Sequence, residues 1–246
     1  MSDHRHDLGI GEVLALLASG HMEIQGMMPW SSNYTLLVTV REGDVQGLAV
    51  YKPRRGERPL WDFPRGTLCQ REFAAFLLSD ALGWSLVPPT VLRDGPYGMG
   101  SVQLYVDCDQ EAHLFTMQKE GGYDDQLARL AAFDVLSNNA DRKSGHCLKG
   151  VDGRLWAIDH GICFHAEPKL RTVLWDYAGE AICDDIMADL RTLRDDVRAG
   201  GRFIRALEGL LAPDEVRAFR RRLDRLIDSG CYPDPGSGRN IPWPPV

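Results

Sequence analysis

The hydrophobic pattern of the chain changes character near residues 107–110, and this change most constrains the fold. Before it, the apolar runs "YTLLVTV" (34–40) and "QGLAVYK" (46–52) flank the turn residues "REGD", which predicts a β-hairpin. After it, apolar residues mostly recur three and four positions apart, as in 124–139 and in much of 176–229. We therefore predict an α+β chain with two lobes: a mostly β first lobe with one key helix, and a mostly α second lobe.

Weaker patterns supply the remaining elements of this prediction. Helices are expected at 10–18 and at 71–84, where apolar residues follow helical spacing. A strand is expected at 101–107, and two short β pieces, at 146–150 and 154–159, are joined by "VDG". The Pro- and Gly-rich end cannot form a regular helix or strand. The predicted divisions are 1–107 for the first lobe, 108–235 for the second lobe and 236–246 for a tail.

Composition excludes several classes of protein. The formal net charge is −7, so a broad nucleic-acid footprint is not expected. No apolar run reaches the length of a membrane span, although peripheral membrane contact is left open. The six cysteines are scattered and contain no C-x-x-C pair, which favours a reducing cytoplasm over a disulfide framework or a zinc site.

Lysine is rare in this chain, which has 23 Arg and only 5 Lys, so a lysine at a special place is informative. Lys52 ends the second strand of the hairpin, and Pro53 keeps it extended. Its ammonium group can reach phosphates, or it can simply snorkel at a strand edge. Glu72 begins the next helix, either as an ordinary first-turn acid or as an ion-pair partner of Lys52.

Two acids flank the second predicted hairpin. Asp141 and Asp159 are 18 positions apart, and the β pieces between them can bring both carboxylates to one edge. One acid can orient or deprotonate a hydroxyl while the other binds Mg²⁺. Arg142 offers another reading, in which it satisfies an acid structurally. Asp134 lies within a helical pattern, so we expect it to brace the loop.

Other polar residues nearby leave alternatives open. His146 suits a metal ligand, a phosphate contact or a satisfied histidine beneath a loop. Asn138 and Asn139 suit the C-terminal cap of a helix. The small polar residues of "PWSSNYT" (29–35) can let backbone amides approach a phosphate, but an ordinary entry to a strand explains them equally well.

In this order, the segments resemble the atypical branch of the protein-kinase-like superfamily. "YKP" followed by "REFAAFLLSDALGWSLVPPTV" looks like the lysine strand and helix of type II phosphatidylinositol 4-kinases and HipA-type serine/threonine kinases. "NNADRKSGHCL" and "GRLWAIDHGICF" look like their catalytic loop and metal-binding segment. The match is nearest to a bacterial family grouped with phosphatidylinositol 3-/4-kinases, and it covers roughly residues 30–175.

The resemblance implies a role for each matched position. Asp141 would be the catalytic acid, assisted by Lys52 and Arg142, and Asp159 and His146 would hold Mg²⁺ or Mn²⁺. Segment 160–175 would be the activation loop, where substrate choice lies. Two departures are visible: His146 stands where an Asn is expected, and Ser31, Ser32 and Asn33 replace glycines. The residues implied to contact ATP are Lys52, Glu72, Ser31, Ser32, Asn33, Gln103, Tyr105, Val106 and Asp107.

The resemblance implies an ATP-dependent kinase. Its acceptor would be a hydroxyl on a protein, an inositol lipid or a small polyol. Two other functions fit the same residues: a pseudokinase that binds nucleotide as a regulatory module, and a nucleotidyl transferase.

Overall fold

The computed structural model describes residues 8–29 and 33–245, and they form two compact units. Unit 1 comprises residues up to Phe73 together with Pro88–Tyr105. Unit 2 comprises Ala74–Val87 and the chain from Val106 onward. The division falls inside helix α2 (Leu68–Ala81), because its two halves pack with different units.

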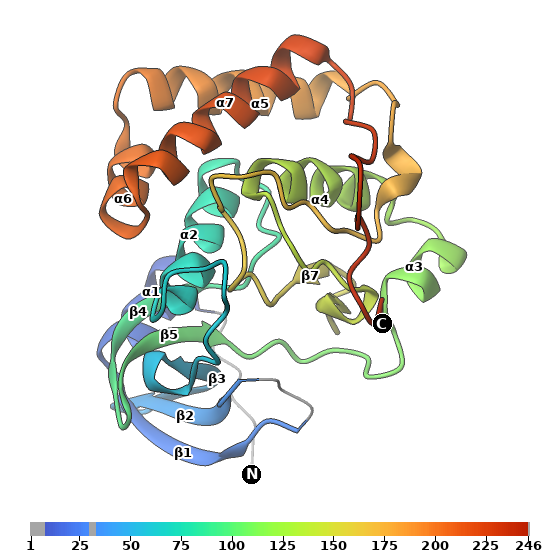
Figure 1. Cartoon of the computed structure of the whole chain (residues 1–246). Helices are drawn as coiled ribbons and strands as arrows, with labels where there is room; N and C mark the ends of the chain where they lie inside the picture. Colours follow the sequence, from blue (N-terminus) through green and yellow to red (C-terminus); the bar gives the residue numbers. More distant parts are fainter. Residues whose placement is uncertain (1–7, 30–32, 246) are drawn as a thin grey trace. The chain divides into compact units, whose positions relative to one another are not determined.

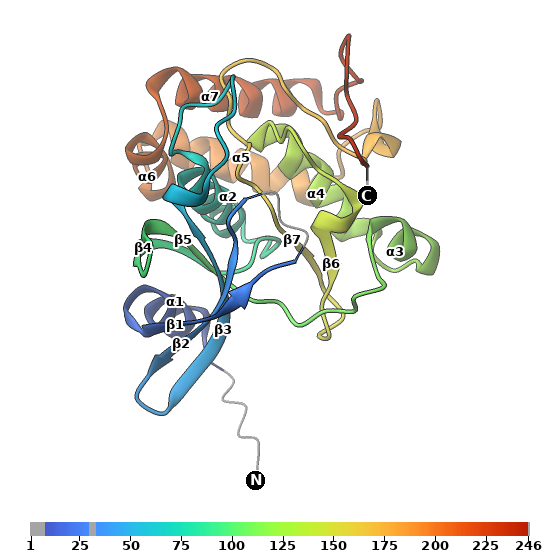
Figure 2. The same cartoon turned by 60° about the horizontal axis from the view of Figure 1, so that its bottom comes forward.

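Unit 1 is built on an antiparallel sheet, with the strand order β1-β2-β3-β5-β4 (Figure 1). Leu16 and Leu17 of α1 pack with alternate residues of the sheet, and Val38 and Tyr51 in this core are fully buried. Figure 2 shows α1 beside the strands and the long β2–β3 hairpin. The bounds of these elements are α1 Ile10–Ser19, β1 His21–Met27, β2 Leu36–Glu42, β3 Val45–Pro53, β4 Thr90–Gly95 and β5 Gly98–Leu104.

The structure confirms the predicted hairpin and corrects its surroundings. Strand β3 pairs with β2 across the "REGD" turn, as expected. The strand predicted at 101–107 instead starts at Gly98 and ends at Leu104. It pairs with β4, where the sequence analysis predicted no strand. Strand β1 was also missed, because its alternating polar residues and mostly exposed positions give no apolar run.

Unit 2 is mostly helical, as predicted. Helix α7 packs against both α4 and α5, and Figure 1 shows these three helices stacked in the upper part of the molecule. A short hairpin of β6 and β7 pairs Cys147 with Ala157 and Lys149 with Leu155, which confirms the two predicted β pieces. The bounds are α3 Leu114–Glu120, α4 Asp124–Ser137, β6 Cys147–Lys149, β7 Leu155–Ala157, α5 Asp184–Arg198, α6 Arg202–Leu210 and α7 Pro213–Ser229.

Local sequence explains where these helices begin and end. Pro213 occupies the first position of α7, and the Glu215 carboxylate accepts a hydrogen bond from the Ala212 amide. Helix α4 begins with Asp124 and Asp125 and ends at Asn138, whose left-handed backbone (φ 50°, ψ 51°) caps it as predicted. The chain therefore reverses at Asn138, directly before the predicted catalytic loop.

Candidate functional site

Lys52 and Glu72 form an ion pair within unit 1. Lys52 Nζ lies 2.5 Å from Glu72 Oε1, and the side chains are 19% and 5% exposed. Ala49, Tyr51 and Pro53 of β3 are buried, so Lys52 belongs to the other face of the strand. The pairing holds the lysine beside α2, and part of the Lys52 side chain remains accessible.

Of the three small polar residues predicted to lie near the phosphates, the structure describes only Asn33. Ser31 and Ser32 lie outside the described residues. Asn33 Oδ1 accepts a hydrogen bond from the Arg58 amide (2.9 Å), so this side chain holds the loop after β3.

The strand predicted at 101–107 ends before most of the residues that were expected to contact ATP. Gln103 is buried in β5 and donates to Thr90 Oγ1 (2.9 Å), which occupies its side-chain amide. Tyr105, Val106 and Asp107 follow the strand rather than belong to it. Their backbone is partly engaged, because the Tyr105 amide donates to Leu48 O and Asp107 O accepts from the Val151 amide.

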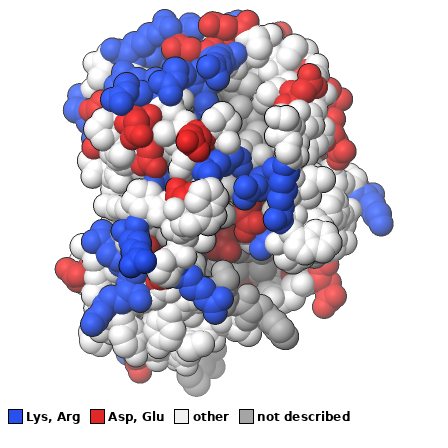
Figure 3. Space-filling view, viewed as in Figure 1, with Lys and Arg blue, Asp and Glu red and all other residues white. Residues whose placement is uncertain are grey.

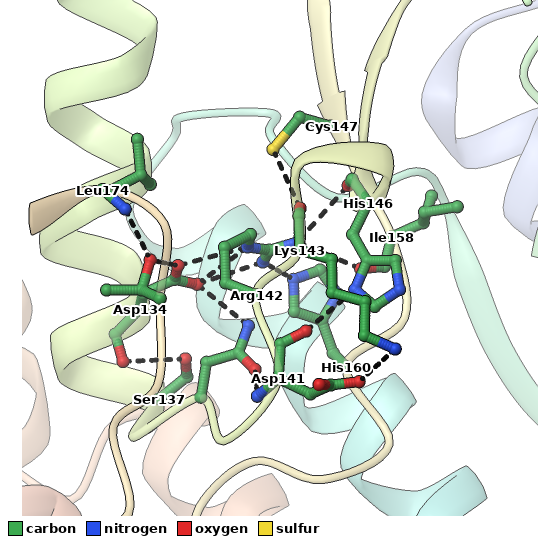
Figure 4. A network of polar contacts seen from close by, with 12 residues as sticks. Asp134, Ser137, Asp141, Arg142, Lys143, His146, Cys147, Ile158, His160 and Leu174 are labelled. Carbon is green, nitrogen blue, oxygen red and sulfur yellow. Dashed lines mark hydrogen bonds and ion pairs between the residues drawn. The ribbon is translucent and has the colours of Figure 1, made fainter. Parts of the chain in front are cut away.

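In unit 2, the predicted catalytic loop is built around a buried ion pair between Asp134 and Arg142. Both side chains are 0% exposed, and the guanidinium bonds both carboxylate oxygens at 3.0–3.1 Å. Arg142 Nη1 also donates to the carbonyls of His146 and Ile158, and Nη2 lies 2.6 Å from His160 Nε2. Figure 4 shows this network. It connects α4 to the loop and to the segment that begins at Asp159.

Arg142 satisfies an acid structurally, which is one of the two readings that the sequence left open for it. Its guanidinium is fully buried against Asp134 and braces the loop. Asp134 braces the loop, as the sequence analysis expected. Its carboxylate also accepts hydrogen bonds from Asn139 Nδ2 and from Thr172 Oγ1, both at 3.0 Å. These contacts satisfy a charge that would otherwise be costly to bury.

Asp141 lies at the accessible edge of this braced loop. Its amide donates to Asn139 Oδ1 (3.0 Å), and its carboxylate Oδ2 lies 3.2 Å from Lys143 Nζ. The side chains of Asp141 and Lys143 are 27% and 23% exposed. The sequence analysis assigned no role to Lys143, although the rarity of lysine was a signal that could have found it.

His146 joins Asp141 to Asp159. Its Nδ1 lies 2.9 Å from the Asp141 carbonyl, which can only accept, so Nδ1 carries the proton. Burial lowers the pKa of His146 below its ordinary value, against the opposing effect of Asp159, and the imidazole is neutral at pH 7. The unprotonated Nε2 then faces Asp159 Oδ2 at 3.4 Å. Two acceptors at this separation favour a cation between them.

The backbone at Asp159 is unusual. Asp159 has φ 63° in the left-handed region, which costs energy for a residue other than glycine. Its side chain is 51% exposed, although apolar residues precede it in the sequence. Strained backbone concentrates at functional sites. The conformation of Asp159 therefore indicates that the orientation of its side chain is important for function.

The segment after Asp159 forms backbone hydrogen bonds with the predicted catalytic loop. The amide of Arg142 donates to Arg171 O, and the amide of Arg171 donates to Asn139 O. The tail packs on the same unit: Asn240 O accepts from the Thr172 amide and from Trp175 Nε1, and Pro245 O accepts from the Ser144 amide. These contacts place the tail, which was predicted at 236–246, on the body of unit 2.

Two features are absent from the part of the chain that the structure describes. Within residues 8–29 and 33–245, no group of three or more His, Cys, Asp or Glu side chains is arranged to hold a metal ion, so His146 and Asp159 form a two-residue set. No helix in the described part of the chain is long and apolar enough to cross a membrane.

Comparisons with known proteins define the class. The structure resembles the crystal structure of a Helicobacter pylori proinflammatory kinase, CtkA, with a TM-score of 0.53 over 88% of this chain and 94% of that one. The two sequences are 11% identical, so this likeness shows the fold alone. The protein therefore has a kinase-like α+β fold, with an antiparallel β-sheet in its N-terminal part and a helical C-terminal part, which confirms the predicted fold class.

Sequence comparisons give the family. The chain is 43% identical to protein Rv2133c of Mycobacterium tuberculosis across 94% of each chain, and it belongs to the same family. It is also 32% identical over 134 residues to phosphatidylinositol 4-kinase gamma 4 of Oryza sativa subsp. japonica. That match covers 45% of this chain and 23% of the plant protein, so the resemblance to phosphatidylinositol kinases is partial. No protein-family model matches the chain.

Proposed function

We propose that this protein is an ATP-dependent phosphotransferase that transfers the γ-phosphoryl group to a hydroxyl. The observation that carries the proposal is the Lys52–Glu72 ion pair between a sheet strand and the following helix, in a chain with a kinase-like fold. Kinases need such a pair in place to hold the phosphates of ATP. The partial similarity to a plant protein named phosphatidylinositol 4-kinase supports the same chemistry.

Asp141 is assigned to the acceptor hydroxyl. Its carboxylate is accessible, and Asn139 fixes its backbone, so it can orient the hydroxyl and take its proton. Lys143, which lies 3.2 Å from this carboxylate, places a positive charge where negative charge develops on the transferred group. The buried Asp134–Arg142 pair contributes by holding the loop in one conformation.

Asp159 and His146 are assigned to a divalent cation. A carboxylate oxygen and an unprotonated imidazole nitrogen, 3.4 Å apart, fit adjacent ligand positions of such an ion. One carboxylate suits Mg²⁺, which takes its remaining ligands from phosphates and water, whereas the imidazole favours Mn²⁺. When bound, the cation would neutralise charge on the phosphates of ATP.

The acceptor is proposed as a hydroxyl on a protein, an inositol lipid or a small polyol. The two kinases in the comparisons differ in this respect: the name of the plant protein specifies phosphatidylinositol, and the name of the Helicobacter pylori kinase specifies no acceptor. Label transfer to several acceptors in one experiment would separate these alternatives.

A second candidate is a pseudokinase, a module that binds nucleotide without turning it over. The observation that favours it is His146, because it stands where the resemblance expects an Asn and forms a set of only two ligands with Asp159. This function predicts ATP binding without metal-dependent consumption of ATP.

The test follows label from γ-labelled ATP, with Mg²⁺ and with Mn²⁺, into the protein itself, mixed proteins, inositol lipids and free inositol. We expect Asp141→Asn and Asp159→Asn to reduce transfer at least ~100-fold. Asp228→Asn is the matched control, because Asp228 is an exposed acid at the end of α7, and its transfer should equal that of the wild type.

Undiminished transfer in Asp159→Asn would rule out the assignment of that residue. ATP binding with no label in any acceptor would favour the pseudokinase. Incorporation from α-labelled ATP instead would indicate nucleotidyl transfer.

A further inference from the structure

Unit 2 contains a groove of about 850 Å³ that does not include the residues assigned to phosphoryl transfer. Its walls are the end of α4, segment 166–171, the last turns of α7 and the tail from Ser229 to Asn240. This volume lies in the range of small-molecule sites in proteins. Asp141, Lys143, His146 and Asp159 do not line it.

The groove concentrates positive charge in a protein whose net charge is −7. Asp234 is the one carboxylate among its described lining residues. Figure 3 shows Lys and Arg side chains gathered along α7 in the upper part of the molecule. The basic residues that line the groove are Lys169, Arg171, Arg221, Arg222, Arg225 and Arg239.

Most of these cations are not neutralised within the chain. Elsewhere in unit 2, exposed arginines pair with acids, as Arg198 does with Asp224 and Arg220 does with Glu208. In the part of the chain that the structure describes, neither Arg171, Arg221, Arg225 nor Arg239 forms an ion pair. Like charges gathered around one hollow repel each other, and an anion would relieve that repulsion.

Arg222 points to a ligand most directly. Its Nε donates to Leu136 O (2.9 Å) and its Nη1 to His165 O (3.3 Å), so backbone carbonyls hold the guanidinium in place. Its Nη2 is buried and has no hydrogen-bond acceptor among the described residues. Burial, aided by the charge of Arg221, lowers the pKa of Arg222 to about 10. A fixed donor without an acceptor is rare in native structures and is a place for a ligand oxygen.

The chemistry of the lining defines the class of ligand. Arginine forks match the oxygens of phosphate groups, and several arginines around one hollow suit several phosphates. Trp175 and Tyr232 add ring surface to the same groove and can cover the apolar face of a compact ligand. We propose that this groove binds an organic polyphosphate of small-molecule size, either free or as the headgroup of a lipid.

The proposal does not depend on phosphoryl transfer, so its test measures binding alone. Binding of inositol hexakisphosphate to the full chain would be measured by calorimetry at physiological ionic strength, where distant charges are screened. The groove variant is Arg221→Gln/Arg225→Gln, whose residues are exposed on α7. The matched control is Arg202→Gln/Arg217→Gln, which removes two exposed charges outside the groove.

We expect the wild type to bind and the groove variant to bind at least about tenfold more weakly, with the control within about twofold of the wild type. Sedimentation with vesicles separates the two sources. A lipid headgroup predicts binding to phosphatidylinositol 4,5-bisphosphate vesicles, lost in the groove variant and competed by inositol hexakisphosphate. Binding to the soluble compound alone indicates a free ligand.

Three results would overturn the proposal. These are no binding of any probe by the wild type, equal losses in the groove variant and the control, and equal binding to vesicles whose charge comes from phosphatidylserine. The last two would show attraction to overall charge rather than a site.

Discussion

The two ion pairs among the predicted site residues, one in each unit, differ in burial and in geometry. Arg142 and Asp134 are completely buried, and the guanidinium bonds two carboxylate oxygens and two backbone carbonyls. Lys52 meets one oxygen of Glu72 and keeps 19% of its side chain exposed. The planar, multidentate side chain of Arg142 braces the loop, whereas the side chain of Lys52 stays partly accessible. A basic residue that lies close to a predicted catalytic residue in sequence can therefore serve to hold the loop.

We expect the largest difference between the two ion pairs in protein stability, from the substitution Arg142→Met. This change leaves the Asp134 carboxylate buried with much of its partner network gone, which costs about 3–5 kcal/mol of unfolding free energy. Urea denaturation followed by circular dichroism measures the loss. The double variant Arg142→Met/Asp134→Leu should recover most of it, because it removes both charges. A single variant as stable as the wild type would contradict the bracing role.

Lys52→Met should lose less stability and more function. Loss of the Lys52 ammonium group removes the partner of Glu72 Oε1, which costs about 1–3 kcal/mol of unfolding free energy. Phosphoryl transfer should fall at least ~100-fold. Lys52→Arg serves as the charge-preserving comparison and should not restore full transfer, because the guanidinium has a different shape. If transfer by Lys52→Met matched the wild type, the lysine would have no role at the phosphates.

Thr172→Val tests the buried network with a smaller change. Its hydroxyl donates to Asp134 Oδ2 (3.0 Å) and accepts from the Leu174 amide (3.2 Å), so its loss should cost about 1–2 kcal/mol. The same substitution at exposed Thr192 is the control, and its unfolding free energy should stay within about 0.5 kcal/mol of the wild type. Equal effects at the two sites would mean that the network is not specially dependent on Thr172.

His146→Asn should produce the smallest effect, a change in metal preference. An amide oxygen replaces the imidazole nitrogen beside Asp159, so the ratio of Mg²⁺- to Mn²⁺-supported transfer should rise a few-fold. Initial rates at saturating metal measure this ratio. A ratio unchanged from the wild type would place His146 outside the metal site and leave it as a contact of the Asp141 carbonyl.

Local chemistry in the sequence predicts a large part of this fold. Apolar spacing gives α4 and α7, the Pro–acid start gives the beginning of α7, and the paired β-branched runs give β2 and β3. The same local patterns do not predict strands β1 and β4. β1 is exposed at most of its positions, and β4 is joined to β5 by a Pro–Gly turn that breaks the pattern. Their stability comes from pairing with neighbours, which a single segment does not reveal.

The candidate site was predictable where it depends on residue type and spacing, and not where it depends on chain reversal. Lys52 and Glu72 lie 20 positions apart in a strand and the next helix, and their pairing was one of the two roles that the sequence left open for Glu72. The partner of Arg142 was not predicted, because Asp134 reaches it only after Asn138 turns the chain back. The basic groove needs α7, segment 166–171 and the tail together, and no local pattern contains all three.

The Asp134 carboxylate has a consequence for how this part of the molecule opens. It joins α4 to the predicted catalytic loop through Arg142 and Asn139, and to the later segment through Thr172. These three pieces should unfold as one cooperative unit, and the amides of Arg142 and Arg171 should exchange with deuterium at similar, slow rates. Releasing segment 160–175 alone would remove partners of the buried Asp134–Arg142 network, which costs free energy. We therefore expect this segment to stay bound to the loop when the protein changes conformation.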